Sequence, residues 1–316
     1  MAEIVVGGAS SHAFALMEPR EWDGFRQWNR RLYAQRYGQE PPENPRVAQE
    51  SDLEIEQRYD AIRRGLETLQ QAFEQAELDA LIVVGDDQEE QFTEENMPQL
   101  AIYLGSRFLC GDYIRGGAEQ EYRCPEGLAW HLFLGLVEEG FDLSACKKFR
   151  EDRLKAHAFG PLLQRLVPKA DIPVLPVFVE AIHVPAPTPR RCYALGKAMR
   201  EAIRAWRGGG RVGILASGGL SHFTAGYPYQ YFEGIHGFSY GSISEDFDRW
   251  VLQQMAEGQG EKLAELSSKD LLEHGEIELR SWLVLLGAIG VTKAQVLAYE
   301  PFYRALMGMG VALWEP

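Results

Sequence analysis

Polar residues suited to metal binding or proton transfer follow four apolar segments of this sequence. They are His12, Asp86, Asp87, Gln88, His183 and His222. A mononuclear Fe(II) site that activates dioxygen commonly uses two imidazoles and one carboxylate, because this set leaves positions open for substrate and gas. His12 is a candidate imidazole for such a site, and Glu276 or Glu278 in "HGEIELRSW" is the candidate carboxylate.

Other active-site motifs fit the sequence less well. The segment "GASSHAFAL" is not the nucleophile elbow of a hydrolase, "RGGGR" lacks the lysine and hydroxyl residue of a P-loop, and no GxGxxG motif follows an apolar segment. A Ser-His-Asp hydrolase that uses Ser10 or Ser221 stays open as an alternative, although nothing in the sequence places a base beside either serine.

Short apolar segments, most of them directly before these polar residues, are predicted to be strands. They cover residues 3–6, 80–84, 101–104, 174–179 and 212–216. Each is rich in Val, Ile and Leu and is followed by glycine or polar residues. Near-continuous apolar strands are typical of a sheet that is buried on both faces. Ligands of such sheets gather at the carboxyl ends of the strands, so we expect the polar residues to share one edge.

Helices are predicted between and after these strands. Residues 53–73 carry apolar side chains at mostly three- and four-residue steps, and Ser51 with Glu54 makes a capping box at the start. A second helix begins at Thr188, which is the N-cap before a proline. The segment 244–290 reads as successive helices that are separated by Gly, Ser and Lys-Asp breaks.

Helices that alternate with strands predict an α/β fold. We expect a single domain over residues 1–316, because no proline-rich linker or internal repeat divides the chain. The expected architecture is a mainly parallel or mixed central sheet with helices on both faces and a helical C-terminal portion.

The composition favours a small-molecule partner. Of 316 residues, 46% are hydrophobic, which is enough for a sizeable core. The formal net charge of -14 disfavours nucleic acid or an anionic membrane as a partner, because phosphate binding needs a basic patch. With no apolar run of about 18 residues and no signal-peptide pattern, we expect a cytoplasmic location. The four cysteines form no CxxC pair, which disfavours a zinc knuckle or a disulfide framework.

The sequence resembles the class III extradiol ring-cleavage dioxygenases, typified by the catalytic β subunit of protocatechuate 4,5-dioxygenase. The segments that carry the resemblance are "SSHAF", "VVGDDQEEQFTEENMPQLAIYLG", "KAHAFGPLL", "PVFVEAIHVPAPTPRRCYALGKAMREAI", "ASGGLSHF", "DFDRWVLQQMAEGQGEKLAELS" and "ELRSWLVLLGA". They occur in the family's order from end to end. The resemblance implies a non-haem Fe(II) enzyme that opens an aromatic ring with dioxygen, with Mn(II) or another divalent metal as an alternative.

The resemblance also implies roles for individual residues. His12 matches the first iron-ligand histidine, and Glu278 matches the ligand carboxylate, with Glu276 as the offset alternative. His222 matches the histidine that acts as acid and base near the substrate hydroxyls. His157 matches a second pocket histidine that helps to orient the substrate.

One position departs from the family pattern. The family has a motif like "GNDH", whose histidine is the second iron ligand, and Gln88 stands here in place of that histidine. A carboxamide oxygen is neutral, hard and a weaker donor than imidazole toward Fe(II). Three compensations are open: Gln88 coordinates through its amide oxygen, Asp86 or Asp87 moves in, or His183 substitutes.

Two rival functions follow from this departure. The chain is either a variant oxygenase or a non-catalytic or regulatory subunit that keeps the fold and pairs with an active partner. A metal-independent or hydrolytic member of the wider superfamily is the third interpretation. For the oxygenase, the resemblance implies a small aromatic substrate and dioxygen as partners. It also implies a homo-oligomer or a small capping subunit, because a small subunit or fused domain covers the pocket in the typical family.

Overall fold

The computed structural model describes residues 1–12, 16–93, 95–111, 119–150, 156–229 and 239–316. Within these residues, a mixed sheet of eight strands has the order β6-β3-β7-β2-β8-β1-β10-β9. Its strands are β1 (Ala2–Ser10), β2 (Ala80–Gly85), β3 (Leu100–Tyr103), β6 (Ser144–Cys146), β7 (Val174–Val179), β8 (Gly210–Ser217), β9 (Gln295–Phe302) and β10 (Met307–Trp314). A separate hairpin pairs β4 (Arg107–Cys110) with β5 (Gln120–Arg123).

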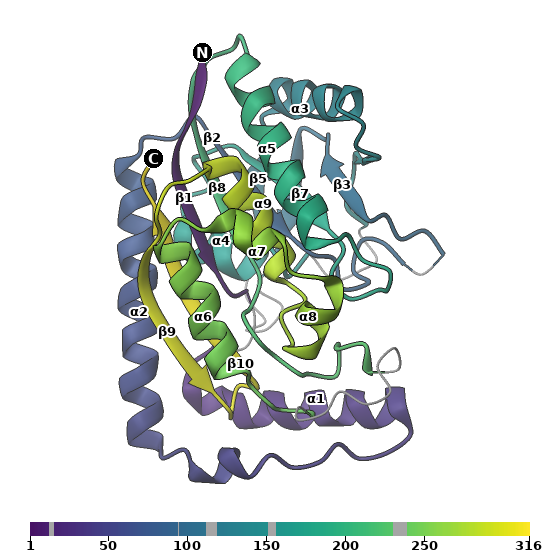
Figure 1. The fold of residues 1–316 in the computed structure, drawn as a ribbon, viewed down its shortest axis with the longest axis vertical. Helices are drawn as coiled ribbons and strands as arrows, with labels where there is room; N and C mark the ends of the chain where they lie inside the picture. Colours follow the sequence, from purple (N-terminus) through teal and green to yellow (C-terminus); the bar gives the residue numbers. More distant parts are fainter. Residues whose placement is uncertain (13–15, 94, 112–118, 151–155, 230–238) are drawn as a thin grey trace.

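The strands β7, β2, β8 and β1 lie side by side and run parallel to one another. Every residue of β2 and β7 is buried, as expected for a parallel sheet that helices cover on both faces. Parallel strands end at the same edge, so the carboxyl ends of these four strands lie together. That edge is on the side of the molecule where helix α1 lies (Figure 1).

Helices cover both faces of the sheet (Figure 1). They are α1 (Trp22–Tyr37), α2 (Asp52–Gln75), α3 (Glu126–Glu138), α4 (Gly160–Leu166), α5 (Pro189–Ala205), α6 (Glu245–Ala256), α7 (Gly260–Ala264), α8 (Ser268–Glu273) and α9 (Leu279–Ile289), with 3-10 turns at Pro19–Glu21 and Pro45–Gln49. In β1, Gly7 faces α9 and Gly8 faces α2. Successive strand residues point to opposite faces, so α2 and α9 cover opposite faces. No helix in the described part of the chain is both long and apolar enough to cross a membrane.

Helix α2 forms as the sequence predicts. The Ser51 hydroxyl accepts the backbone N–H of Glu54 at 3.3 Å, and the Glu54 carboxylate accepts the backbone N–H of Ser51 at 3.2 Å. This capping box satisfies N–H groups at the helix start that have no partner inside the helix. The apolar side chains of α2 are buried at Ile55, Tyr59, Ile62, Leu66, Leu69 and Phe73. The predicted capping box is therefore confirmed, and so is the apolar face from Ile55 onward, whereas Leu53 in the first turn is exposed.

Glycines allow α5 and α9 to approach each other closely. A Cβ atom at Gly196 of α5 would overlap the carbonyl oxygen of Val284 in α9. A Cβ atom at Gly287 of α9 would likewise overlap the carbonyl oxygen of Tyr193 in α5. Helix α9 also contacts β1, β2 and β8, so this close packing sets the height of α9 above the sheet.

Gly196→Ala should therefore destabilise the fold by about 3 kcal/mol, the upper end of the usual effect of overpacking, because the new methyl group meets backbone atoms. Gly135→Ala in α3 is the matched control. Its new Cβ atom would lie 3.6 Å from Ala202 Cβ, which is an ordinary contact. The control should be neutral or gain up to about 1 kcal/mol from helix propensity. Urea unfolding of both variants measures the difference, and equal stability of the two would contradict the packing described here.

The predicted strands are confirmed, and β1 and β8 extend beyond their predicted ends. The sequence does not predict the hairpin of β9 and β10 that follows the C-terminal helices. The segment "MGMGVALW" of β10 contains two glycines and no polar alternation, so it has a weak strand signal. Its strand conformation comes from antiparallel pairing with β1, which places Trp314 opposite Gly7 and Val311 opposite Ser10.

Candidate metal centre

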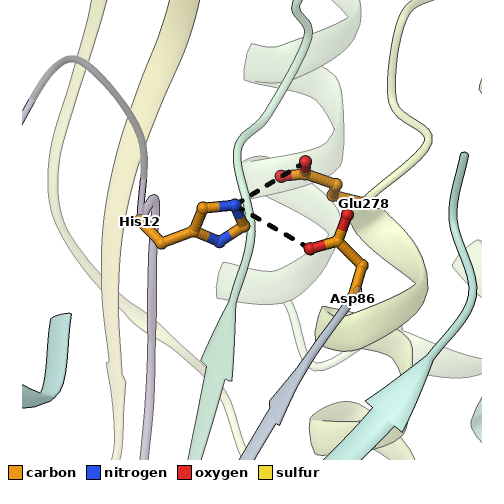
Figure 2. Close-up of side chains that lie close together, drawn as sticks. All are labelled: His12, Asp86 and Glu278. Carbon is orange, nitrogen blue, oxygen red and sulfur yellow. Dashed lines mark ion pairs between the residues drawn. The ribbon is translucent and has the colours of Figure 1, made fainter. Parts of the chain in front are cut away.

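Three polar side chains converge where β1, β2 and β8 end (Figure 2). His12 lies two residues after β1, Asp86 directly follows β2, and Glu278 is the N-cap of α9, which packs against all three strands. The Nε2 atom of His12 lies 3.8 Å from Asp86 Oδ1 and 3.8 Å from Glu278 Oε1. All three side chains are buried. Their donor atoms lie within 4.8 Å of one another, so they can surround a single metal ion.

The hydrogen bonds of His12 direct its Nε2 lone pair at this group. The Ser217 hydroxyl donates its hydrogen to the carbonyl oxygen of Ala158, so its oxygen accepts the Nδ1–H of His12 at 3.2 Å. The proton of the neutral imidazole is therefore on Nδ1, and Nε2 is an acceptor. Among the described residues, His12 Nε2 and Asp86 Oδ1 are buried atoms without a hydrogen-bond partner. Unsatisfied buried polar atoms are rare in proteins, and a bound cation would satisfy both.

The charges of the group also fit a cation. Burial lowers the pKa of His12 to about 4, so its imidazole is neutral at physiological pH. Burial and the charge of Glu278 raise the pKa of Asp86 well above its ordinary value. Burial also raises the pKa of Glu278, but the charge and hydrogen bond of His222 and the hydrogen bond from the N–H of Gly219 act together with His12 to lower that pKa to about 2. Two carboxyl groups this close need a proton or a cation to offset their repulsion.

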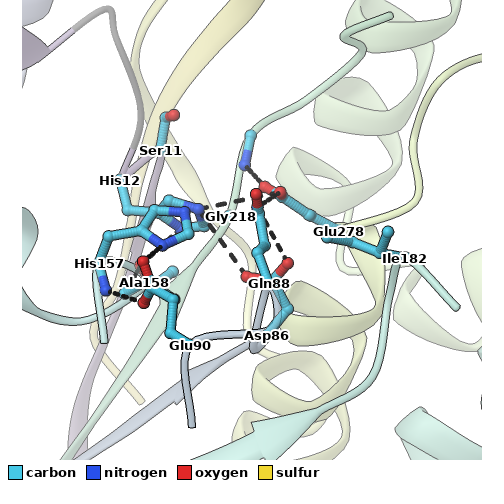
Figure 3. Close-up of polar contacts among 12 residues, drawn as sticks. Ser11, His12, Asp86, Gln88, Glu90, His157, Ala158, Ile182, Gly218 and Glu278 are labelled. Atoms are coloured by element: carbon cyan, nitrogen blue, oxygen red, sulfur yellow. Dashed lines mark hydrogen bonds and ion pairs between the residues drawn. The ribbon is translucent and has the colours of Figure 1, made fainter. Parts of the chain in front are cut away.

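Gln88 lies across the two carboxylates (Figure 3). Its Nε2 atom donates to Asp86 Oδ2 and to Glu278 Oε1, each at 3.2 Å. The amide nitrogen therefore faces the carboxylates, and an amide nitrogen is a donor without a lone pair for a metal. In this orientation Gln88 bridges the two carboxylates, and Asp86 supplies the oxygen atom that joins His12 and Glu278.

Asp87 turns away from this group. Its carboxylate accepts the backbone N–H of Gln91 at 3.0 Å and that of Phe92 at 2.8 Å, which closes the turn after β2. Burial raises the pKa of Asp87 to about 6. The structure thus corrects the expectation that Asp87 stands in for the missing imidazole, because its oxygen atoms are committed to the backbone.

His183 also lies outside the group. Its Nδ1 atom is 3.1 Å from Glu180 Oε1, and its Nε2 atom is 3.0 Å from Glu89 Oε1. The hydrogen bond to Glu180 raises the pKa of His183 to about 9. Both ring nitrogens thus contact glutamate oxygen atoms, and neither joins the group of His12, Asp86 and Glu278. The expectation that His183 substitutes as a ligand is therefore corrected as well.

His157 packs against His12 and is held by a residue that sequence analysis missed. The two imidazole rings meet edge to face, with 5.0 Å between their centroids. Glu90 accepts the backbone N–H of His157 at 2.7 Å and lies 2.6 Å from its Nδ1 atom (Figure 3). Burial alone would lower the pKa of His157, but the charge and hydrogen bond of Glu90 raise it to about 9. The partners are 67 residues apart, so no local motif reveals the pair.

Two residues beside these side chains have left-handed backbone conformations. Glu89 has a φ of 62° and Ala156 has a φ of 43°. This region costs a non-glycine residue roughly 1–2 kcal/mol, because Cβ crowds the following carbonyl group. The turn at Glu89 directs Gln88 toward the carboxylates and Glu90 toward His157, and Ala156 directly precedes His157. Strained residues of this kind cluster at functional sites.

His222 approaches the same group from the segment after β8. Its Nε2 atom lies 3.3 Å from Glu278 Oε1, and its Nδ1 atom lies 2.7 Å from the carbonyl oxygen of Leu220. Burial would lower the pKa of His222, but the charge and hydrogen bond of Glu278 raise it to about 9. The structure thus places a proton-carrying imidazole directly beside the three converging side chains.

Glu276 faces Asp248 and not His12. Its side chain is buried, and burial together with the Asp248 charge raises its pKa well above the ordinary value. Glu276 lies in the segment before the N-cap of α9, and of the two glutamates only Glu278 joins His12 and Asp86. Glu276 is therefore corrected as the offset alternative to Glu278.

Glu90→Gln should remove a pH-dependent part of the stability of the metal-free protein. The pKa of His157 is raised from 6.5 to about 9 in the fold, so its pairing stabilises the fold fully below about pH 6.5 and is lost as the pH rises through 9. We expect the variant to be less stable than the wild type by up to about 3 kcal/mol near pH 6 and by much less near pH 10. Urea denaturation at both pH values measures this, and an equal loss at both would contradict the ion pair.

Comparison with known proteins gives a family match over most of the chain. A family model described as "Catalytic LigB subunit of aromatic ring-opening dioxygenase" matches residues 42–313. This range includes Asp86, Gln88, His157, His222 and Glu278 and begins after His12.

Several curated relatives are similar to parts of the chain. Gallate dioxygenase from Pseudomonas putida is 27% identical over 195 residues, which cover 60% of this chain and 52% of that protein. The 2,3-dihydroxyphenylpropionate/2,3-dihydroxicinnamic acid 1,2-dioxygenase of Klebsiella pneumoniae subsp. pneumoniae is 32% identical over 150 residues, or 46% of this chain and 45% of that protein. The chain thus spans about half the length of the curated relatives it matches.

A solved structure shares the fold. The crystal structure of the uncharacterized protein JW3007 from Escherichia coli K12 aligns with a TM-score of 0.50 and 15% sequence identity. The alignment covers 78% of this chain and 91% of that protein. At this identity the likeness supports the α/β architecture alone.

Proposed function

The chain belongs to the family of the catalytic LigB subunit of aromatic ring-opening dioxygenases, and on this basis we propose that it is a non-haem Fe(II)-dependent dioxygenase that opens the ring of a catechol-like substrate. The observation that carries the proposal is the convergence of His12 Nε2, Asp86 Oδ1 and Glu278 Oε1 at one buried point. In this proposal residues 1–316 act as one catalytic domain, and the partners are a small aromatic substrate and dioxygen.

We propose His12, Asp86 and Glu278 as the metal ligands, with Gln88 bridging the two carboxylates. Compared with the family motif "GNDH", the segment "GDDQ" changes two positions at once. The first change adds an anionic oxygen donor at Asp86, and the second removes an imidazole at Gln88. Imidazole is a donor that suits iron, and carboxylates suit Mn(II), so this set has donors for either ion. A bound ion of this kind would polarise the substrate oxygen and hold the reactants together.

His222 is the proposed acid and base. It takes a proton from a substrate hydroxyl and later returns it, which requires an imidazole that is partly neutral at the working pH. In the metal-free protein its pKa is about 9, largely because Glu278 is charged. A cation on Glu278 would offset that charge and lower the pKa of His222 toward neutrality. His222 would then be better able to accept a proton from the substrate when Glu278 holds a metal ion.

His157 is the proposed substrate-orienting residue. Glu90 holds its ring in one orientation and keeps it positively charged at neutral pH. A positively charged ring next to His12 attracts the negative oxygen of a deprotonated catechol. We therefore expect His157 to favour substrates that bind as anions.

The test of the proposed function begins with iron content. The wild type, His12→Ala and Gln88→His are purified without oxygen, supplied with Fe(II), and analysed for bound iron. Oxygen uptake is then followed with gallate, protocatechuate and 2,3-dihydroxyphenylpropionate. We expect the wild type to hold near-stoichiometric iron and consume oxygen with at least one catechol, and His12→Ala to lose both properties.

Other outcomes favour the rival functions. If only Gln88→His binds iron, the natural chain is a non-catalytic or regulatory subunit, and a search for its active partner follows. Turnover that persists in a strong chelator without oxygen indicates a metal-independent member of the superfamily. We also propose that the active form is a homo-oligomer or a complex with a small capping subunit. Light scattering gives the molar mass of the purified protein and thus shows whether the chain forms a homo-oligomer by itself.

A further inference from the structure

We infer that Asp248 is a positioning residue for His222 and acts through Ser221. The inference rests on the proposed acid and base role of His222. Asp248 lies on α6, away from the group of His12, Asp86 and Glu278, and both Asp248 and Ser221 are fully buried.

Asp248 accepts both hydrogen-bond donors of Ser221. Its Oδ1 atom accepts the backbone N–H at 3.1 Å, and its Oδ2 atom accepts the hydroxyl at 2.9 Å. The Ser221 hydroxyl oxygen accepts the N–H of Ser244 at 2.7 Å, and its carbonyl oxygen accepts the N–H of Gly308 at 2.9 Å. Every polar group of Ser221 is bonded, so this residue has a single position. Its hydroxyl donates to a carboxylate, which argues against Ser221 as the nucleophile of a hydrolase.

The position of Ser221 sets the position of His222, which is the next residue. Two carboxylates hold this segment at alternate residues. Glu278 Oε2 accepts the N–H of Gly219 at 2.6 Å, and Asp248 accepts the N–H of Ser221. With the backbone anchored at these two positions before it, His222 has its Nε2 atom 3.3 Å from Glu278 Oε1. The backbone before His222 is therefore held by two carboxylates, those of Glu278, which is a proposed metal ligand, and of Asp248.

The C-terminal hairpin holds Asp248 in turn. Tyr299 of β9 donates its hydroxyl to Asp248 Oδ2 at 2.6 Å. A Cβ atom at Gly308 of β10 would overlap Asp248 Oδ2, so glycine is required there. The two strands thus connect the position of His222 to the main sheet.

A positioning role and a purely structural role predict different results. If Asp248 only stabilised the fold, Asp248→Asn would lower the unfolding temperature, but its folded molecules would transfer protons like the wild type. An asparagine at this position offers an NH2 group where Ser221 and Tyr299 present hydroxyl donors. Those hydroxyl groups must then turn, and the ring of His222 shifts while the metal ligands stay in place.

The probe for this difference is 4-nitrocatechol, bound without oxygen to the Mn(II)-loaded protein. Its absorbance changes as it loses each hydroxyl proton, so its spectrum reports whether the site has accepted the second proton. We expect the wild type to bind the doubly deprotonated form, and His222→Gln and Asp248→Asn to bind the singly deprotonated form. Asp246→Asn, at an exposed aspartate of the same helix, is the matched control and should give the wild-type spectrum.

The turnover numbers of these variants should change in parallel with their spectra. With any catechol that the wild type cleaves, kcat of Asp248→Asn should fall roughly 10- to 100-fold, as expected for a small displacement of a reacting group. Tyr299→Phe removes one hydrogen bond to Asp248 and should lower kcat about 2- to 10-fold. The KM and the Mn(II) affinity of both variants should stay close to the wild-type values.

The outcomes separate this inference from the proposed function. A wild-type spectrum in Asp248→Asn and Tyr299→Phe, with a changed spectrum in His222→Gln, overturns the inference and leaves the proposed function in place. If the wild type binds no catechol, the proposed function fails. The inference about Asp248 is then tested by crystal structures of the wild type and Asp248→Asn. An unmoved His222 ring in the variant overturns the inference, and a displaced ring supports it. If Asp248→Asn does not fold, Tyr299→Phe and Ser221→Ala carry the same test.

Discussion

Asp86→Asn is expected to weaken the binding of Fe(II) or Mn(II) by more than about 100-fold, because it removes an anionic donor. Substitution of residues that only contact a metal ligand already lowers metal affinity about 10- to 100-fold, so the loss of a ligand should cost more. The neighbouring substitution Asp87→Asn should leave the affinity nearly unchanged. Both substitutions replace a carboxyl group of the same turn with an amide of the same size, so a large difference in metal affinity between them indicates direct coordination by one of them. Calorimetric titration with Mn(II), repeated by electron paramagnetic resonance of the free ion, measures both affinities.

In the metal-free protein, the order of the two variants should be reversed for thermal stability: Asp86→Asn should be the more stable and Asp87→Asn the less stable. The carboxyl of Asp86 is buried beside Glu278 with a raised pKa, so a neutral amide at this position should raise the unfolding temperature. Asp87→Asn weakens the hydrogen bonds to the N–H groups of Gln91 and Phe92 and should cost about 1 kcal/mol. Equal metal affinity in the two variants, or a loss in Asp87→Asn alone, would exclude Asp86 as a ligand.

His222→Gln should lower kcat by about 100- to 10,000-fold while the protein keeps its metal, which is the range for loss of a general acid and base. Glutamine has a comparable reach and can still hydrogen-bond to Glu278, but it cannot accept and return a proton. The loss should therefore appear in kcat more than in KM. Steady-state oxygen uptake with the best catechol measures it, together with the metal content of the same sample.

His131→Gln is the matched control for this substitution. His131 lies on α3, where its Nε2 atom contacts the carbonyl oxygen of Ala202, far in the fold from the end of β8. This variant should keep wild-type turnover. If His222→Gln keeps it as well, His222 is not the acid and base, and His157 becomes the next residue to substitute.

The turn after β2 serves several parts of the molecule at once. Asp86 joins His12 and Glu278, Asp87 closes the turn, Gln88 bridges the carboxylates, Glu89 pairs with His183, and Glu90 holds His157. Consecutive polar residues thus reach different partners, because the left-handed conformation of Glu89 changes the direction of the chain. A substitution in this turn therefore has an effect that depends strongly on its position.

The central sheet and its principal helices could be predicted from local patterns in the amino-acid sequence. The strands over residues 80–84 and 174–179 are continuous apolar runs, and burial on both faces is their only stable environment. The start of α2 follows from the local chemistry of Ser51 and Glu54. The resemblance to a known family also selected His12, His157, His222 and Glu278, which the structure places around one point. Information of this kind is local, or is carried by ordered motifs.

The directions of neighbouring polar side chains at the strand ends could not be predicted in this way. Asp86 and Asp87 are chemically identical, but Asp87 accepts backbone N–H groups of the turn, whereas Asp86 accepts from Gln88, which also donates to Glu278, 190 residues away. The pairing of Glu90 with His157 and the strand conformation of β10 likewise depend on distant partners. Beyond the end of a strand, side-chain direction depends on hydrogen bonds to remote segments, and no pattern in the local sequence encodes these bonds.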